Sequence, residues 1–197
     1  NIKCKSLFNL DRVDEAILFF EKFKENHPHQ FNLPMWTMDN EYESCSTTYA
    51  YLCETAAMRK SLGLERAFHE NGQLRMSSSL TEDSKNLLEK AIDETTEILS
   101  NTEHQASQNG IKVLQAQCYR LLEKFEESRI ILEEIPLKYD FKNTGFEKIL
   151  TLFFGREFQK CIEFCSTYLD SFPDHSFVKL LLPSRILGLA TQVNLQN

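Results

Sequence analysis

The feature that most constrains this chain is a pattern of apolar and small residues that occurs twice, first from Phe125 and again from Phe158. Its first copy is Phe125, Ser128, Leu132 and Ile135, and its second is Phe158, Cys161, Cys165 and Tyr168. Spacings of three and four residues place each set on one face of a helix. A further apolar run precedes each copy, at 113–122 and 146–154. Units of about 34 residues that bury their apolar faces only against neighbours form helical arrays, so the sequence predicts stacked helix–turn–helix units between Ile111 and Pro173.

The same spacing occurs near the start of the chain, in a predicted helix at 11–26. Its members are Val13, Ala16, Phe20 and Phe23. Asp11 is suited to cap this helix. Pro28 follows Ala16 by twelve residues, and Pro173 follows Cys161 by the same interval. Because proline cannot donate a backbone hydrogen bond within a helix, both prolines are expected to follow the end of a second helix of the unit.

A small residue, an aromatic residue four positions later and a closing proline resemble the tetratricopeptide repeat family. Ala16, Phe20 and Pro28 match this pattern, Cys161, Cys165 and Pro173 match it with Cys as the small residue, and Tyr119 fits the first-helix tyrosine. In the middle copy Asp140 stands where the proline is expected. The resemblance implies an all-α fold, a right-handed superhelical array of helix–turn–helix repeats. About four hairpins and a terminal helix would then form a single α-solenoid fragment over residues 1–197.

An inserted loop is predicted at 27–40. The interval from Ala16 to Ser128 exceeds three periods of about 34 residues by roughly ten residues. This segment holds two prolines and the only tryptophan of the chain. We expect its apolar residues to pack back on the helices: Phe31, Leu33, Met35 and Trp36. The alternative is an exposed loop that binds a partner.

The remaining helices follow from apolar periodicity and capping residues. We predict them at 41–62, 64–72, 82–101 and 176–189, the last interrupted by Pro183. Ser79 and Glu82 form a capping-box signal before the third of these helices. The polar segment 102–110 is expected to be a turn.

The net charge of −7 comes entirely from residues 31–110, which hold 13 acidic and 6 basic residues. A basic surface for nucleic acid is therefore not expected. The acidic middle is interpreted as a solvated face, with a basic protein partner as the alternative. Since no run of about 18 apolar residues occurs, no membrane span is expected. The sequence begins without Met, as a fragment of a longer protein would.

Six cysteines occur, most of them on apolar helical faces. We expect all six to be free thiols, which indicates a reducing compartment and therefore an intracellular protein, cytoplasmic or nuclear. Cys161 and Cys165 share a helical face, as metal ligands would, but the repeat buries both positions. We therefore expect no metal and no cofactor.

No motif for a nucleophile, a phosphate-binding loop or a dinucleotide site is present. Pairs of acidic residues lie on predicted solvent-facing helix surfaces. We therefore expect a protein that is not an enzyme.

Recognition of another protein remains as the expected function. In arrays of this family the first helices of successive units line a concave groove, and the resemblance places eight candidate partner-binding residues there: Lys5, Phe8, Asn9, Gln117, Arg120, Phe146, Leu150 and Phe153. The expected function is a protein–protein interaction scaffold, part of a larger protein or assembly, that binds an extended segment or helix of a partner. The alternative is a regulatory domain that senses a short peptide and changes curvature on binding it.

Overall fold

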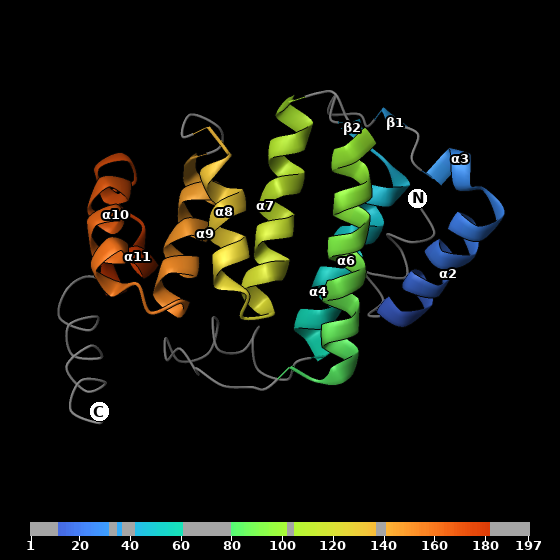
Figure 1. Cartoon of the computed structure of the whole chain (residues 1–197), viewed down its shortest axis with the longest axis horizontal. Helices are drawn as coiled ribbons and strands as arrows, with labels where there is room; N and C mark the ends of the chain where they lie inside the picture. The colour runs from blue at the N-terminus through green and yellow to red at the C-terminus, as the bar shows by residue number, and fades with distance from the viewer. Residues whose placement is uncertain are drawn as a thin grey trace. The chain divides into compact units, whose positions relative to one another are not determined.

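The computed structural model describes residues 12–31, 35–36, 42–60, 80–101, 105–136 and 141–181. The fold is all-α, as predicted, with one short two-stranded ribbon in the described part (Figure 1). The chain divides into two compact units, Asn1–Cys118 and Tyr119–Asn197, and the boundary lies within one helix.

The first unit contains three long helices that pack on one another, together with the start of a fourth. Its elements are α2 (Val13–Asn26), α3 (Pro28–Phe31), β1 (Met35–Trp36), β2 (Tyr42–Glu43), α4 (Cys45–Lys60), α6 (Glu82–Asn101) and the greater part of α7 (Gln105–Leu121). α4 packs along α6, and α2 packs on α4 (Figure 1).

Helix α2 has most of the buried face that the spacing predicts. Val13, Ala16 and Phe20 are buried, together with Ile17, whereas the predicted Phe23 is half-exposed. Asp14 and Glu15 lie in the first turn, where negative charge interacts favourably with the helix dipole. The predicted cap, Asp11, lies outside the described residues.

Helix α4 begins at Cys45, four residues later than predicted. Tyr42 and Glu43 pair with Trp36 and Met35 in the antiparallel ribbon instead. The helix begins where it does because the Ser44 hydroxyl accepts a hydrogen bond from the backbone N–H of Thr47 at 3.0 Å, as an N-cap does. The buried residues of α4 include several small ones, which allow α6 to approach closely: Ala50, Cys53, Ala56 and Ala57.

Helix α6 has the predicted bounds. Thr81 caps it, since its hydroxyl oxygen accepts the backbone N–H of Ser84 at 3.2 Å; the predicted capping residue, Ser79, lies outside the described part. Its apolar stripe is buried from Leu87 to Thr95 and half-exposed at Ile98 and Leu99. The prediction of helix 64–72 also falls outside the described residues.

The segment predicted as an inserted loop is partly helical. Pro28–Phe31 form a single helical turn, and Phe31 is fully buried against the rings of Phe20 and Tyr49, with centroid separations of 6.3 and 6.0 Å. Phe31 therefore packs back on the helices as expected. The side chains of Leu33, Met35 and Trp36 are outside the described part of the structure.

The prediction of a turn at 102–110 is wrong from Gln105 onward, where α7 is already helical; residues 102–104 lie outside the described part. Residues 105–110 form the first two turns of this helix. Further along α7, the Gln115 amide donates to Thr96 on α6 at 2.8 Å, so a polar pair connects these two helices.

The second unit begins with the end of α7 and continues with α8 (Phe125–Glu133), α9 (Phe141–Phe154), α10 (Phe158–Ser171) and α11 (Ser176–Leu181). α9 packs between α8 and α10, and α11 packs on α10 (Figure 1). The two copies of the sequence pattern lie on α8 and α10. Their buried members are Ser128, Leu132, Ile135, Cys161, Cys165 and Tyr168.

Two matching turns end α7 and α9. Glu123 and Arg156, which are separated by the same interval as the two copies of the pattern, have φ of 60° and 62°, in the left-handed region. The backbone N–H of Lys124 donates to Tyr119 and that of Glu123 to Arg120; Glu157 and Arg156 donate to Leu152 and Phe153 in the same way. Both turns are therefore Schellman motifs, which satisfy the last carbonyl groups of each helix.

The five cysteines in the described part are free, and Cys53, Cys118, Cys161 and Cys165 are buried. Cys4 lies outside the described residues.

Candidate functional site

The eight predicted partner-binding residues do not come together on one exposed surface. Lys5, Phe8 and Asn9 lie outside the described residues. Gln117 is half-exposed on the part of α7 that belongs to the first unit. The other four lie in the second unit, where their surroundings differ sharply.

Leu150 and Phe153 are corrections to the prediction. Each is only 4% exposed, so neither can contact a partner while the unit is folded as it is here. Phe153 packs edge-on against Phe154 and Phe158, with ring centroids 5.5 and 6.0 Å apart. The sequence did carry a signal for this, because apolar residues at nearly every position from Ile149 to Phe154 indicate a helix buried all round.

Arg120 is engaged inside the unit and is not available as the exposed cation that the prediction required. Its guanidinium forms a two-pronged ion pair with Glu147 of α9: Nε contacts one carboxylate oxygen, and Nη2 lies 3.2 Å from the other. The two side chains are 12% and 3% exposed. The guanidinium also lies over the ring of Phe154, 5.9 Å from its centroid. Arg120 is thus a structural residue here.

Phe146 is the predicted residue whose position fits contact with a partner best. It is half-exposed, and its ring lies against the imidazole of His175 with centroids 4.9 Å apart. His175 lies in turn against Tyr168, at 5.5 Å. Lys142 and Asn143, in the first turn of α9, are exposed. We call the surface formed by Lys142, Asn143, Phe146 and His175 the α9 rim.

A second candidate surface, which the sequence did not suggest, is a charged cleft in the first unit. It has a volume of about 670 Å³ and is lined by Glu21, Lys24, Glu25, Pro28 and Lys90. Its residues come from α2, from the start of α3, and from α6. Helix α6 is far from the other two segments in the sequence. No local motif could have brought them together, because the spacing between α2 and α6 is set by the packing of both helices on α4.

Ion pairs hold the walls of this cleft. Lys90 Nζ lies 2.6 Å from a carboxylate oxygen of Glu21, which also accepts the hydroxyl of Tyr49 at 3.1 Å. Lys24 Nζ lies 2.6 Å from Glu94 and 3.2 Å from Glu97. The lysines are therefore already neutralised by neighbouring carboxylates.

Glu94 is the most buried charge of this cluster, at 3% exposure. The Ser46 hydroxyl of α4 donates to its carboxylate alongside Lys24. Burial opposes the charged form of Lys24, but the hydrogen bonds to Glu94 and Glu97 outweigh burial and raise its pKa. The three helices α2, α4 and α6 are thus joined at one carboxylate.

The Cys53 thiol of α4 is not a nucleophile. Burial raises the pKa of Cys53 to about 12, so the thiolate that a nucleophile requires is absent at neutral pH. Burial, together with the neighbouring Cys53 and Glu21, also raises the pKa of Tyr49. These groups act as buried hydrogen-bonding side chains of the core.

Cys161 and Cys165 also have a packing role. Both are fully buried, their sulfur atoms are 4.0 Å apart, and the Cys161 thiol donates to the backbone carbonyl of Ile149 at 3.7 Å. The hydrogen bond with Cys165 and burial raise the pKa of Cys161. Within the described residues, no group of three or more His, Cys, Asp and Glu side chains could hold a metal ion.

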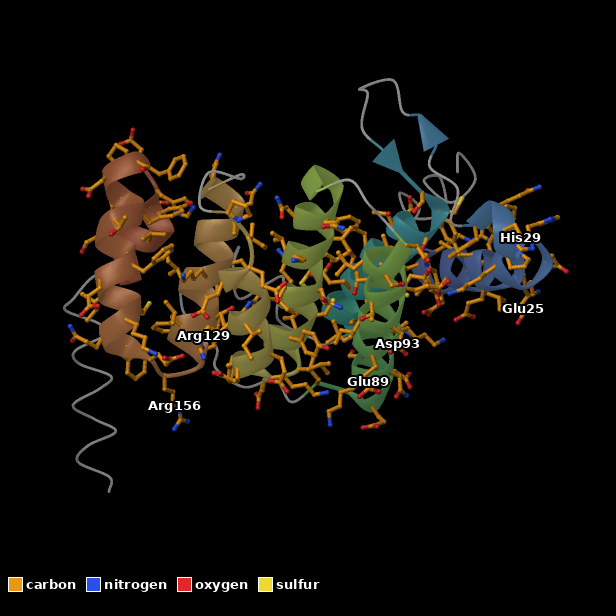
Figure 2. The ribbon with its side chains drawn as sticks, turned by 45° about the horizontal axis from the view of Figure 1, so that its top comes forward. Glu25, His29, Glu89, Asp93, Arg129 and Arg156 are labelled. Carbon is orange, nitrogen blue, oxygen red and sulfur yellow. The ribbon has the colours of Figure 1, made fainter. Side chains whose placement is uncertain are left out.

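The acidic surface considered as an alternative partner site lies on α6. Glu89 and Asp93 are exposed, one helical turn apart, and project from this helix into solvent (Figure 2). On α8, Arg129 (Figure 2) pairs with Glu126 and, at 2.6 Å, with Glu133.

None of the described helices combines the length and the apolar character needed to cross a membrane. In comparisons with known proteins, no protein-family model, no curated protein and no solved structure matches this chain.

Proposed function

We propose that this chain is a tetratricopeptide-like segment that serves as a protein–protein interaction scaffold. The observation that carries the proposal is the pair of matching Schellman turns, at Glu123 and Arg156, whose separation equals that of the two copies of the sequence pattern. Equal hydrogen bonds at equal sequence intervals are what a repeated helix–turn–helix unit requires. Stacked units of this kind present extended surfaces that bind other proteins.

The buried residues of α8 and α10 support the same proposal. Ser128 and Leu132 of α8 occupy the positions that Cys161 and Cys165 occupy on α10, and all four are buried. The first residue on each helix forms a hydrogen bond to α9. Ser128 pairs with the hydroxyl of Thr151 at 3.0 Å, and Cys161 donates to the backbone carbonyl of Ile149 at 3.7 Å. Both neighbours of α9 therefore use the same repeat position to contact it.

The α9 rim is the proposed contact for an extended segment or helix of the partner. It combines an exposed amide and amine with two stacked rings, and aromatic residues are enriched among the side chains that dominate binding energy. Lys5, Phe8, Asn9 and Gln117 remain proposed contacts. A scaffold of this kind needs no metal, cofactor or catalytic group, and its free thiols suit a reducing cytoplasmic or nuclear compartment.

Site-specific photo-crosslinking in extract of the native cell tests this proposal. A photoreactive residue at Asn143 should capture one partner reproducibly, whereas the same residue at Ile130, which is 49% exposed on α8, should not. Equal capture at both positions, or capture only at Ile130, would contradict the proposed surface.

Binding to the captured partner then separates recognition from packing. Phe146→Ala should cost about 1–4 kcal/mol of affinity without changing the helical circular dichroism spectrum. His175→Ala removes the ring that packs on Phe146 but leaves Phe146 in place, so it should cost less. If His175→Ala abolishes binding and Phe146→Ala does not, Phe146 is not the contact residue.

A further inference from the structure

One face of α9 and its closing turn carries three residues spaced four apart, Glu147, Thr151 and Gly155. This spacing aligns them along the helix. Each contacts the hairpin formed by the last turn of α7 and by α8, which we call the first hairpin. The three contacts differ in chemistry: an ion pair, a hydroxyl pair and a close approach without a side chain.

The ion pair lies at one end of this stripe. Arg120 reaches Glu147 with two nitrogens, and the carboxylate is almost completely buried. Removing two charges from water costs about as much as their attraction returns, so a pair of this kind contributes little net stability. An unpaired charge at the same place is strongly destabilising, and this asymmetry penalises any packing that separates Arg120 from Glu147.

The other two contacts continue along the stripe. The hydroxyls of Ser128 and Thr151 are hydrogen-bonded at 3.0 Å and buried. At Gly155, an added Cβ would lie 3.2 Å from Cβ of Phe125, the first residue of α8. Each residue of the stripe therefore contacts a different residue of the first hairpin: Arg120, Ser128 or Phe125.

A slip of the first hairpin by four residues along α9, about 6 Å, shows what the stripe excludes. Arg120 would then lie opposite Thr151, Ser128 would lie opposite Gly155, and Glu147 would be buried without a cation. The apolar neighbours discriminate less, since Ile149, Leu150, Leu152 and Phe153 present large apolar groups in either register.

We propose that the stripe Glu147, Thr151 and Gly155 specifies the register of the first hairpin on α9. In this device the Arg120–Glu147 pair provides selectivity for one packing and not net stability. This proposal is independent of partner binding, since each of the three contacts lies within the second unit.

The test compares a broken pair with an apolar replacement of the whole pair. Arg120→Met leaves Glu147 buried and unpaired, and should lower the Tm of the full chain by about 6–15 °C. Arg120→Met with Glu147→Met should restore the Tm to within about 3 °C of the parent. In this double variant, amide hydrogen exchange in α8 and α9 should be at least about tenfold faster, and their amide NMR signals should broaden or double.

Arg129→Met is the matched control, because it removes an exposed Arg–Glu pair on the same hairpin. It should change neither the Tm nor the exchange of α9. The proposal is overturned if the double variant gives one sharp set of signals with unchanged exchange. It is also overturned if the double variant is as unstable as Arg120→Met. Should Arg120→Met alone fail to fold, the double variant still decides between these outcomes.

Discussion

Replacing Gly155 by alanine should destabilise the second unit, although alanine is the better helix former. In the equivalent turn at the end of α7, the same place is occupied by Leu122. A side chain is therefore accommodated at this place in the α7 turn, and the requirement for glycine comes from the closer surroundings of Gly155. An added Cβ would lie 2.9 Å from the backbone carbonyl oxygen of Thr151, and 3.2 Å from Cβ and 3.4 Å from Cγ of Phe125 on α8.

Two opposing free energies determine the size of this effect. Alanine gains up to about 0.8–1 kcal/mol over glycine in a helix. An extra methyl group in a tightly packed contact costs about 1–3 kcal/mol. The gain applies in full only inside a helix, whereas Gly155 lies in the closing turn. We expect a net loss of about 0.5–2 kcal/mol, which corresponds to a decrease in Tm of roughly 1–8 °C for a chain of this length.

Thermal unfolding followed by circular dichroism, with hydrogen exchange of 141–154 as the local measurement, checks this prediction. Arg156→Ala is the matched control: it changes the next residue of the same turn, which is exposed, and should stay within about 0.5 kcal/mol. A Gly155→Ala variant as stable as the parent, or more stable, would refute the packing argument.

Three further predictions concern the turns, the buried carboxylate and the buried thiol. Glu123→Gly and Arg156→Gly should each stabilise the chain by a few tenths to about 1 kcal/mol in urea unfolding, because glycine adopts the left-handed conformation without strain; a loss of stability at both positions would contradict the assigned turns. Lys24→Met should cost about 1–3 kcal/mol by leaving Glu94 buried with only a hydroxyl partner, measured by the same unfolding; an unchanged midpoint would show that Ser46 suffices. Native Cys53 should resist alkylation at pH 8–9, since burial raises its pKa to about 12, while all six cysteines should react after denaturation; rapid modification of native Cys53 would contradict its burial. Because the unfolded thiol loses its proton near pH 9, before the folded one, Cys53 should also make the free energy of unfolding decrease between about pH 9 and 12.

The helices that could be predicted accurately are those with one apolar face and a clear cap. The predicted helix 82–101 matches α6 at both ends, because a polar face alternates with the buried stripe. Its cap is Thr81, whereas the prediction used Ser79. The prediction was late for α7 and α9, whose first turns are polar. Gln105 and Phe141 begin these helices without apolar periodicity, so their extent depends on tertiary packing that the local pattern does not record.

The candidate site was harder to predict than the fold, and the reason is the position of α9 between two helices. Periodicity separates a buried face from an exposed one when a helix has one neighbour. Helix α9 has a neighbour on each side, so Leu150 and Phe153 are buried although the family pattern places them toward a groove. Only the beginning of the helix, at Lys142 and Asn143, reaches solvent fully.

Arg120 illustrates a second limit of the sequence. An arginine among apolar residues on a helix is equally compatible with two roles. It can be an exposed contact for a partner, or it can be one half of an internal ion pair. Glu147, which decides between them, is 27 residues away and on another helix. No helical or strand periodicity relates residues at that distance, so the pairing follows only from the way the first hairpin packs on α9. Within this unit, the charge that the sequence analysis assigned to partner binding therefore takes part in the packing of the unit itself, and the proposed recognition uses the α9 rim in its place.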